Sequence, residues 1–282
     1  MNHLYGVIGD PIAHSMSPVM HQAALEDSGL EGTYMKFHVT PDALPQAIGG
    51  IRALGIRGVN ITVPHKVAVM ELLDRIDPLA ESIGAVNTIV NDNGVLTGYN
   101  TDGPGYVEGL QKALVGDVTD KSVLMLGAGG AAKAIFYSLA SIGVTHIDIA
   151  NRTETRAADM IAACPFAISS SFIPMDEAGA AVSRYDIIIQ TTSIGMSPDV
   201  GHSPLAFDSV KEGSLFSDII YNPLETAIMK RARELGAQTQ NGLEMFVHQG
   251  ALAFEKWTGI TPDTETMKKI VLKQLGGQHV NR

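Results

Sequence analysis

The sequence predicts an α/β protein with two domains. Apolar runs of strand length alternate with helical patterns along the chain, which is typical of mostly parallel sheets covered by helices. A glycine-rich turn near the middle of the chain joins a strand directly to a helix. The length of 282 residues is sufficient for two such domains.

Composition and charge exclude several classes of function. Twenty Lys+Arg against 30 Asp+Glu give a net charge of −10, so the chain has no basic excess for nucleic acid or an anionic membrane. No apolar run reaches the length of a membrane span, and the first residues lack a signal-peptide pattern. The single Cys164 excludes an internal disulfide and a thiolate metal cluster. We expect a cytoplasmic protein, and the sequence leaves monomer and homodimer open.

The first half of the chain predicts one sheet with its helices. The expected helices cover Pro18–Asp27, Pro41–Ala53 and Lys66–Leu73. The expected strands are Leu4–Ile8, Tyr34–Val39, Gly58–Val63, Ala85–Val90 and Val95–Gly98. The last two flank Asn91–Gly94, a hairpin turn signal.

The glycine-rich turn lies in the setting that indicates dinucleotide binding. A strand at Val123–Leu126 leads through the turn into a helix at Ala131–Ile142, and a second strand follows at His146–Ala150. Gly127 permits the tight turn, and Gly129 lets a pyrophosphate approach the helix N-terminus. Ala132 is small enough for close packing of the helix on the strand.

The residues after the second strand favour NADP over NAD. An NAD enzyme usually places an acidic residue there for the ribose 2′-hydroxyl, whereas this chain has Asn151, Arg152, Thr153 and Arg156. Guanidinium groups pair with a phosphate in a forked geometry, and an acid would repel it. Further strands near Asp186–Gln190, Ser214–Asp218 and Gln238–Thr239 complete this sheet, and helical patterns over Leu243–Trp257 and Thr264–Leu275 follow it.

Three polar groups follow strands of the first domain, where open α/β sheets bind their ligands. The hydroxyls of Ser15 and Ser17 suit a carboxylate or a polyol, although Ser17 is also the expected N-cap of the helix that begins with Pro18. Lys66 follows the strand at 58–63, and Asp102 follows the strand at 95–98. An aspartate beside a lysine can orient it and share its proton, but a surface lysine and a turn aspartate are the ordinary alternatives.

Taken together, these motifs resemble the shikimate dehydrogenase family. The residues that carry the resemblance are HSMSP at 14–18, NITVPHK at 60–66, GAVNT at 84–88, YNTDG at 99–103, GAGGA at 127–131, NRT at 151–153, QTTSIGM at 190–196, DIIYNP at 218–223 and NGLEMFVHQ at 241–249. They occur in the family order and cover nearly the whole chain. The resemblance implies an NADP-dependent oxidoreductase that reduces 3-dehydroshikimate to shikimate in the chorismate pathway of aromatic amino acid biosynthesis.

The resemblance also implies roles for individual residues. Lys66 and Asp102 match the catalytic pair, although it stays open whether Lys66 carries the proton or stabilises an alkoxide by its charge. The implied substrate residues are Ser15, Ser17, Thr62, Lys66, Asn87, Asp102, Tyr221 and Gln249. The implied NADP residues are Gly127, Ala128, Gly129, Gly130, Ala131, Asn151, Arg152, Thr153, Arg156, Thr192, Ser193, Ile219, Gly242 and Met245.

The family fold implies a substrate domain at 1–103, to which helices at 241–282 return, and a Rossmann-type NADP domain at 104–240. The chain differs from the family pattern at Gln190, often asparagine, at Ile219, often methionine, and at His65. We expect His65 to point away from Lys66 if the strand continues. The alternatives are a quinate/shikimate dehydrogenase of dual specificity and a non-catalytic NADP-binding sensor. No metal is expected, because the histidines lack ligand spacing and hydride transfer needs none.

Overall fold

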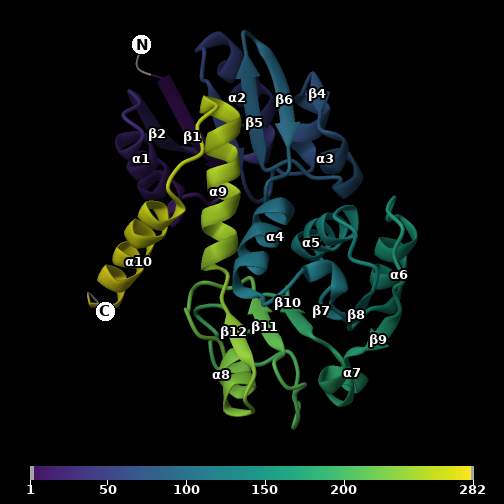
Figure 1. The fold of residues 1–282 in the computed structure, drawn as a ribbon. Helices are drawn as coiled ribbons and strands as arrows, with labels where there is room; N and C mark the ends of the chain where they lie inside the picture. Colours follow the sequence, from purple (N-terminus) through teal and green to yellow (C-terminus); the bar gives the residue numbers. More distant parts are fainter. Residues whose placement is uncertain (1–2, 281–282) are drawn as a thin grey trace. The chain divides into compact units, whose positions relative to one another are not determined.

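The structure is a computed structural model that describes residues 3–280, with side chains to residue 276. It divides into two compact units: residues 1–105 with 247–282, and residues 106–246. Both are α/β, as Figure 1 shows, and the divisions fall within α4 (Asp102–Ala113) and α9 (Leu243–Thr258). The two-domain α/β class predicted from the sequence is therefore confirmed.

The first unit is built on a six-stranded mixed sheet in the order β2-β1-β3-β5-β6-β4. Its strands are β1 (His3–Gly9), β2 (Gly32–His38), β3 (Gly58–Ile61), β4 (Arg75–Ile76), β5 (Thr88–Asp92) and β6 (Val95–Tyr99). β5 is antiparallel to both β3 and β6, and the other pairings are parallel. The ends of β1, β3 and β6 and the start of β5 consequently meet at one edge of the sheet.

The helices of the first unit follow its strands, as expected, with one exception. They are α1 (Ser17–Asp27), α2 (Leu44–Ala53), α3 (Pro78–Ile83), α10 (Thr264–Val280) and the 3₁₀ turns at Pro41–Ala43 and Ala68–Leu72. The helix predicted over Lys66–Leu73 is wrong, because only the 3₁₀ turn forms there. β3 also ends at Ile61 instead of Val63, so the segment that carries Thr62 and Lys66 is a loop.

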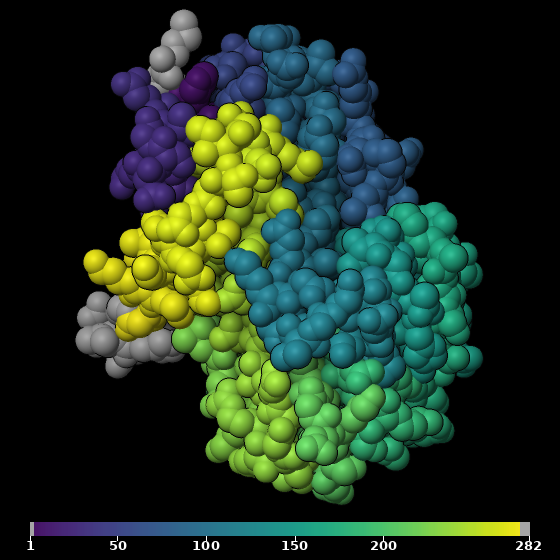
Figure 2. Space-filling model, in the orientation of Figure 1, coloured from purple at the N-terminus to yellow at the C-terminus, as the bar shows by residue number. Residues whose placement is uncertain are grey.

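Trp257 anchors the returning C-terminal segment in the first unit. Trp257 of α9 is 2% exposed and donates its indole N–H to the carbonyl of Ile89 at 3.0 Å. Gly58 lies directly under the indole, where a Cβ would be 2.2 Å from Trp257 Cδ1. Figure 2 shows the yellow C-terminal helices against the purple segment that contains α1, and α1 and α10 are in contact. Residues 247–258 of α9 thus belong to the core of the first unit.

The second unit has an all-parallel sheet in the order β12-β11-β10-β7-β8-β9. Its strands are β7 (Val123–Leu126), β8 (Ile147–Asn151), β9 (Phe172–Pro174), β10 (Ile187–Gln190), β11 (Leu215–Asp218) and β12 (Gln238–Gln240). The chain runs outward from β7 to β9 and then returns to β10 beside β7. This reversal makes the β7/β10 edge the topological switch point, where such sheets bind ligands.

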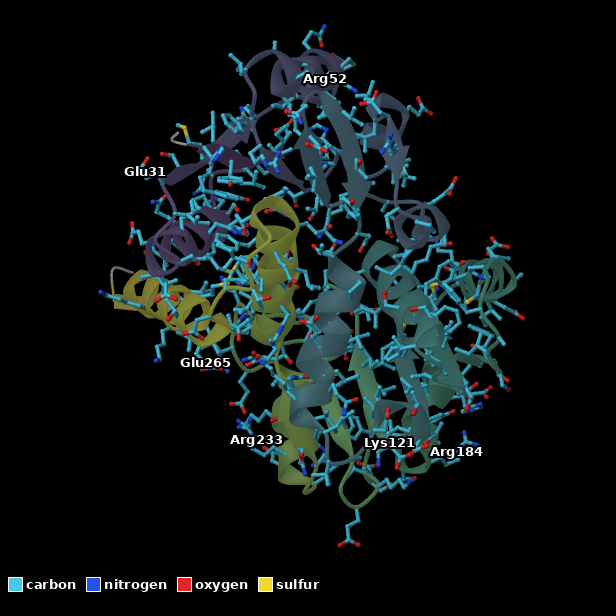
Figure 3. All side chains as sticks on the ribbon, turned by 45° about the horizontal axis from the view of Figure 1, so that its top comes forward. Glu31, Arg52, Lys121, Arg184, Arg233 and Glu265 are labelled. Atoms are coloured by element: carbon cyan, nitrogen blue, oxygen red, sulfur yellow. The ribbon has the colours of Figure 1, made fainter. Side chains whose placement is uncertain are left out.

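Apolar packing covers the second sheet. β7 and β10 are fully buried, and apart from Gln190 their side chains are aliphatic or methionine. The helices are α5 (Gly130–Ser141), α6 (Glu154–Ala162), α7 (Met175–Ala181) and α8 (Ala227–Glu234), with 3₁₀ turns at Val118–Asp120 and Val182–Arg184. Charged side chains such as Arg184 and Arg233 project outward (Figure 3). Burying each leucine-sized side chain contributes about 1.5–3 kcal/mol. Among residues 3–280, no helix is both long enough and apolar enough to cross a bilayer.

Candidate active site

Lys66 and Asp102 form an ion pair at the strand-end edge of the first sheet. Lys66 Nζ lies 2.6 Å from Asp102 Oδ2, and both side chains are partly exposed. The strand register brings them together: Asn60 of β3 pairs with Thr88 of β5, which pairs with Tyr99 of β6. Residues that follow β3 and β6 therefore converge, although 36 positions separate Lys66 from Asp102 in sequence. A hydrogen-bonded cation–carboxylate pair open to solvent can exchange protons with a ligand.

Short-range hydrogen bonds fix both members of the pair. The Lys66 carbonyl accepts the N–H of Val86, which anchors the loop after β3. Asp102 is the first residue of α4, and the Asn100 side chain accepts its N–H at 3.1 Å. His65 is buried, with Nε2 2.7 Å from the carbonyl oxygen of Val39. His65 is thus engaged at Val39 and is no member of the Lys66–Asp102 pair, in a segment where the strand does not continue.

The structure corrects the role expected for Ser17 as an N-cap. α1 begins at Ser17 itself, so Pro18 takes its second position. Ser15 is the residue that bonds to the helix start: its Oγ accepts the N–H of Ser17 at 3.3 Å. The hydroxyl of Ser17 is buried and faces the phenol of Tyr34. Ser15 and Ser17 thus belong to one hydrogen-bonded turn in the loop after β1.

Asn87 and Gln249 come together in the same unit, 162 positions apart in sequence. Asn87 Nδ2 donates to Thr101 Oγ1 at 2.9 Å and to Gln249 Oε1 at 3.5 Å. α9 approaches closely because Gly105 has no side chain: a Cβ there would lie 2.4 Å from Gln249 N. Thr62 is half-buried at the end of β3, where its N–H donates to Ile8. The first unit therefore gathers amides and hydroxyls, the groups that bind a polyol.

The glycine turn after β7 has the backbone that the motif requires. Gly127 has φ +112°, and a Cβ there would meet Thr191 Oγ1 at 2.6 Å, so only glycine fits without strain. The Cβ positions of Gly129 and Gly130 face open space, and no side chain caps α5. Ala132 is fully buried against the sheet. The uncapped N–H groups and the open approach fit a pyrophosphate.

The cationic residues after β8 are exposed and unpaired. Arg152 and Arg156 make no ion pair or hydrogen bond with any residue the structure describes. Asn151 donates from Nδ2 to the carbonyl of Thr153, which folds the turn before α6. Two free guanidinium groups in a chain of net charge −10 make this turn a local site for an anion.

Of the residues implied for the nicotinamide side, Thr192, Ser193 and Ile219 follow the carboxyl ends of β10 and β11, whereas Gly242 and Met245 lie at the start of α9. Gln190 accepts the N–H of Thr192 at 2.8 Å and donates to the carbonyls of Thr192 and Ile194, so it holds the turn that carries Thr192 and Ser193. Gly242 lies against Ile219, where a Cβ would be 1.9 Å from the carbonyl oxygen. Met245, one turn further along α9, is half-buried. A methyl carbon of Thr192 is also 3.1 Å from the Cβ position of Gly127.

Tyr221 lies in the second unit, where its ring stacks on Phe246 at a centroid distance of 5.0 Å. Burial raises the pKa of the Tyr221 phenol, so its hydroxyl stays a donor at neutral pH. The preceding Asp218 holds the loop: it accepts from the N–H of Ile220 at 2.9 Å and from the hydroxyl of Thr226 at 2.7 Å. Asp218 is therefore the anchor of the segment that carries Ile219 and Tyr221.

Asp218 gives the protein a pH-dependent stability. Burial raises the pKa of its carboxyl to about 6, although the two hydrogen bonds favour the ionised form. Since the unfolded carboxyl titrates near 3.8, the folded state binds more protons between these values, and stability falls as pH rises through this window. We expect the free energy of unfolding of the wild type, relative to Asp218→Asn, to fall by on the order of 2–3 kcal/mol between about pH 4 and pH 7.

Urea denaturation across this pH range measures the difference. Asparagine keeps the size of the side chain and an acceptor oxygen but does not titrate. Asp208→Asn, at an exposed carboxylate of the same unit, is the matched control for the loss of an acidic side chain. If the free energies of unfolding of the wild type and of Asp218→Asn differ by the same amount at every pH, this prediction is wrong.

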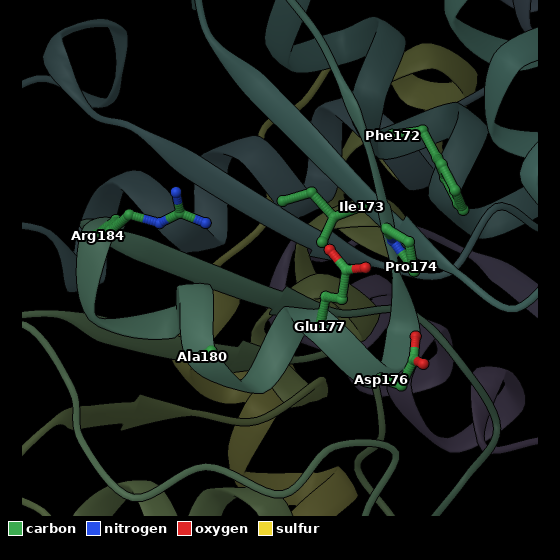
Figure 4. Close-up of a pocket in the computed structure, with 7 residues that line it drawn as sticks. All are labelled: Phe172, Ile173, Pro174, Asp176, Glu177, Ala180 and Arg184. Atoms are coloured by element: carbon green, nitrogen blue, oxygen red, sulfur yellow. The ribbon is translucent and has the colours of Figure 1, made fainter.

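A hollow at the edge of the second sheet contains none of the candidate residues. It is lined by residues of β9 and α7 and by Arg184 (Figure 4). Its side chains carry charges of both signs and belong to the edge strand, at the opposite end of the strand order from β12. The candidate catalytic and binding residues thus lie outside this hollow, most of them near strand ends.

Sequence reasoning missed several polar residues behind the site. Asn60 opens the NITVPHK motif and Thr101 lies within YNTDG, so their place in these motifs was the available signal. Tyr34 had none, because a tyrosine in an apolar strand is typical of a core residue. The structure shows Asn60, Thr88 and Thr101 hydrogen-bonded around Asn87.

Comparison with known families covers most of the chain. Residues 7–89 match the family described as the shikimate dehydrogenase substrate binding domain. Residues 109–198 match the shikimate/quinate 5-dehydrogenase family, and residues 242–272 the shikimate 5′-dehydrogenase C-terminal domain. Among curated proteins, the shikimate dehydrogenase (NADP(+)) of Bacillus cereus strain AH187 is 54% identical over 277 residues, which are 98% of this chain and 100% of the relative.

Solved structures agree with the sequence comparison. The shikimate 5-dehydrogenase of Thermus thermophilus in complex with NADP(H) and shikimate has a TM-score of 0.86 at 35% identity, covering 96% of this chain and 99% of that chain. The Listeria monocytogenes enzyme in complex with shikimate and NAD has a TM-score of 0.90 at 36% identity, covering 96% of each chain.

A parallel sheet with a glycine turn at its switch point, joined to a unit with a lysine–aspartate pair, defines a two-domain, dinucleotide-dependent α/β enzyme. Within this class, the chain belongs to the shikimate dehydrogenase family, NADP-dependent oxidoreductases by the name of its curated relatives. This confirms the resemblance carried by the sequence motifs.

Proposed function

We propose that the protein catalyses the reversible, NADPH-dependent reduction of 3-dehydroshikimate to shikimate, a step towards chorismate and the aromatic amino acids. The observation that carries the proposal is the Lys66–Asp102 pair at 2.6 Å, set among amides and hydroxyls that suit a polyol. The 54% identity to a curated NADP-dependent shikimate dehydrogenase supports it. A reaction of small, water-soluble metabolites suits the cytoplasm, and we include that location in the proposal.

The substrate is proposed to bind at the strand-end edge of the first unit. Ser15, Ser17 and Tyr221 are assigned to its carboxylate, as the family resemblance implies. Thr62, Asn87 and Gln249 are assigned to the ring hydroxyls. The hydrogen bond between Asn87 and Gln249 supports this grouping, because it places two amides from distant parts of the chain at one point.

NADP is proposed to bind the second unit. The turn from Gly127 to Ala131 is assigned to the pyrophosphate, and Asn151, Arg152, Thr153 and Arg156 to the adenosine phosphate. Thr192, Ser193, Ile219, Gly242 and Met245 are assigned to the nicotinamide side. The open Cβ positions at Gly129 and Gly130 and the unpaired arginines support these assignments, since both features favour an anionic ligand.

Proton transfer falls to Lys66 in this mechanism. Bound NADPH supplies the hydride that reduces the C3 carbonyl carbon. The carbonyl oxygen then carries the electron pair of the broken π bond and needs one proton, which the Lys66 ammonium donates from Nζ. Asp102 holds that ammonium by a hydrogen bond and stabilises its charge. In the oxidising direction the neutral amine accepts the proton of the C3 hydroxyl.

Absorbance of NADPH tests the proposal directly. Purified protein is assayed with shikimate and with quinate, each in the presence of NADP and of NAD. We expect rapid reduction of NADP with shikimate and little in the other three reactions. Comparable rates with quinate or NAD would assign the protein to dual specificity. No reaction in any of the four, with NADP still bound, would contradict an enzymatic role.

A further inference from the structure

A row of buried hydrogen bonds runs behind the proposed substrate residues of the first unit and starts at Tyr34 on β2. Tyr34 is 5% exposed, and its hydroxyl donates to Asn60 Oδ1 at 2.7 Å. Burial raises the pKa of the Tyr34 phenol well above its ordinary value, against the opposing effect of the Ser17 side chain. The phenol therefore keeps its proton and remains a donor at any working pH.

The bond from Tyr34 and the Asn87 carbonyl together hold the Asn60 amide in one orientation. With its oxygen held by the phenol, Asn60 donates from Nδ2 to Thr88 Oγ1 at 3.2 Å and to the Asn87 carbonyl at 3.3 Å. Asn60 is only 6% exposed and Thr88 fully buried. A reversed Asn60 amide would set its oxygen against the Asn87 carbonyl oxygen, which can only accept, and would remove the acceptor of the Tyr34 hydroxyl.

The row of hydrogen bonds continues from Asn60 through Thr88 to Asn87. Thr88 Oγ1 accepts from Asn60, so its own hydroxyl proton is free to donate to Asn87 Oδ1 at 3.0 Å. The N–H of Thr101 also donates to Asn87 Oδ1, at 2.7 Å. Thr101 Oγ1 also lies 3.2 Å from this oxygen, which is therefore fully engaged within the protein, and the Asn87 NH₂ group faces Thr101 Oγ1 and Gln249.

The ring of Tyr34 is itself fixed. It stacks on His21 at a centroid distance of 4.5 Å and an interplanar angle of 8°. Burial lowers the pKa of His21 to about 3, although the Asn60 side chain raises this pKa to a smaller extent. The imidazole is therefore neutral and places no charge beside the Tyr34 phenol. The phenol is therefore held in place both by the stacked imidazole and by its bond to Asn60.

From this geometry we propose that Tyr34 is a positioning residue for substrate: its hydroxyl holds Asn60 and, through Thr88, keeps the Asn87 NH₂ group facing Gln249, the other amide assigned to the ring hydroxyls. The inference rests on the proposed function. Tyr34 itself touches neither substrate nor cofactor in this scheme, and it acts entirely through the amides. It also links the Ser17 side of the site to the Asn87 side.

Tyr34→Phe removes the hydroxyl and keeps the stacked ring. We expect the KM for shikimate to rise about tenfold, with a smaller change in kcat and an unchanged KM for NADP, since loss of one buried hydrogen bond corresponds to roughly a factor of ten. Tyr5→Phe is the matched control. Tyr5 is equally buried in the same aromatic cluster, 5.5 Å from Trp257, and its hydroxyl bonds to none of the described residues.

A double-mutant cycle tests whether Tyr34 acts through Asn60. In the Asn60→Ala background, Tyr34→Phe should change the KM for shikimate less than about twofold, because the group that it orients is gone. Additive effects of the two substitutions would overturn the proposed relay. If Asn60→Ala does not fold, the comparison of Tyr34→Phe with Tyr5→Phe decides by itself.

The results separate this inference from the proposed function. A wild type that does not oxidise shikimate refutes the function. An active wild type in which Tyr34→Phe and Tyr5→Phe have the same KM for shikimate refutes only the positioning role. A lower melting temperature of Tyr34→Phe with unchanged KM values would show a purely structural phenol and would also overturn the inference.

Discussion

Lys66→Ala is expected to lower kcat for shikimate oxidation by about 10²–10⁴-fold, the range that positioned acid–base groups contribute. Lys66 Nζ is bonded to Asp102 at 2.6 Å, so the substitution removes the donor and leaves the carboxylate without its partner. Binding of NADP should be nearly unchanged, because the residues proposed to hold it lie in the second unit. Steady-state kinetics and fluorescence titration with NADP measure the two effects separately.

The matched control for Lys66→Ala is Lys273→Ala, at an exposed lysine of the same unit. It removes the same charge and should leave kcat unchanged. Lys66→Arg then separates proton transfer from charge, because a guanidinium keeps the positive charge but does not give up its proton near neutral pH. Loss of turnover in both Lys66 variants supports proton transfer, whereas activity retained by Lys66→Arg supports stabilisation of the alkoxide. Near-normal turnover of Lys66→Ala would remove the catalytic assignment.

Arg152→Ala is expected to raise the KM for NADP by about 10–100-fold, with little change in the KM for shikimate. Hydrogen bonds to a charged group are worth about 1.5–3 kcal/mol, and Arg152 has no protein partner among the described residues to compete for its guanidinium. Activity with NAD, which lacks the 2′-phosphate, should not fall. The ratio of kcat/KM for NADP to kcat/KM for NAD should therefore fall by the same factor.

Arg184→Ala provides the control for the arginine experiment. Arg184 is another exposed arginine of the second unit without an ion pair to any described residue, and its loss should leave both KM values unchanged. Combining Arg152→Ala with Arg156→Ala should lower affinity for NADP further, if both guanidinium groups contact the phosphate. Equal increases in the KM for NADP and for shikimate would count against the phosphate role of Arg152.

Several parts of the protein could be predicted because they depend on residues close together in sequence. The strand, glycine turn and helix at 123–141 follow from apolar periodicity and from the glycine at position 127. Its φ of +112° is one that a residue with a side chain adopts only with strain. Arg152 and Arg156 could be predicted as site residues because they come shortly after the strand β8 in sequence. The nine short motifs indicate the family without any knowledge of spatial contacts.

Two predictions of local structure were wrong because tertiary hydrogen bonds override local propensity there. Residues 66–73 have a helical pattern, but the Lys66 carbonyl bonds to Val86 instead of continuing a helix, and only a 3₁₀ turn forms. Ser17 has the residue type and the following proline of an N-cap. Its hydroxyl nevertheless faces the buried phenol of Tyr34, and Ser15 makes the bond at the helix start.

The sequence by itself determined the α/β class, the nucleotide-type turn and the chemical groups of the site, because each is encoded in a short segment. Only the tertiary structure decided which of these groups meet. Strand pairing across β3, β5 and β6 brings Lys66 to Asp102, and the return of α9 brings Gln249 to Asn87. Tyr34 acquires its place behind Asn60 in the same way, since hydrogen-bond partners in a sheet are set by strand register and not by distance along the chain.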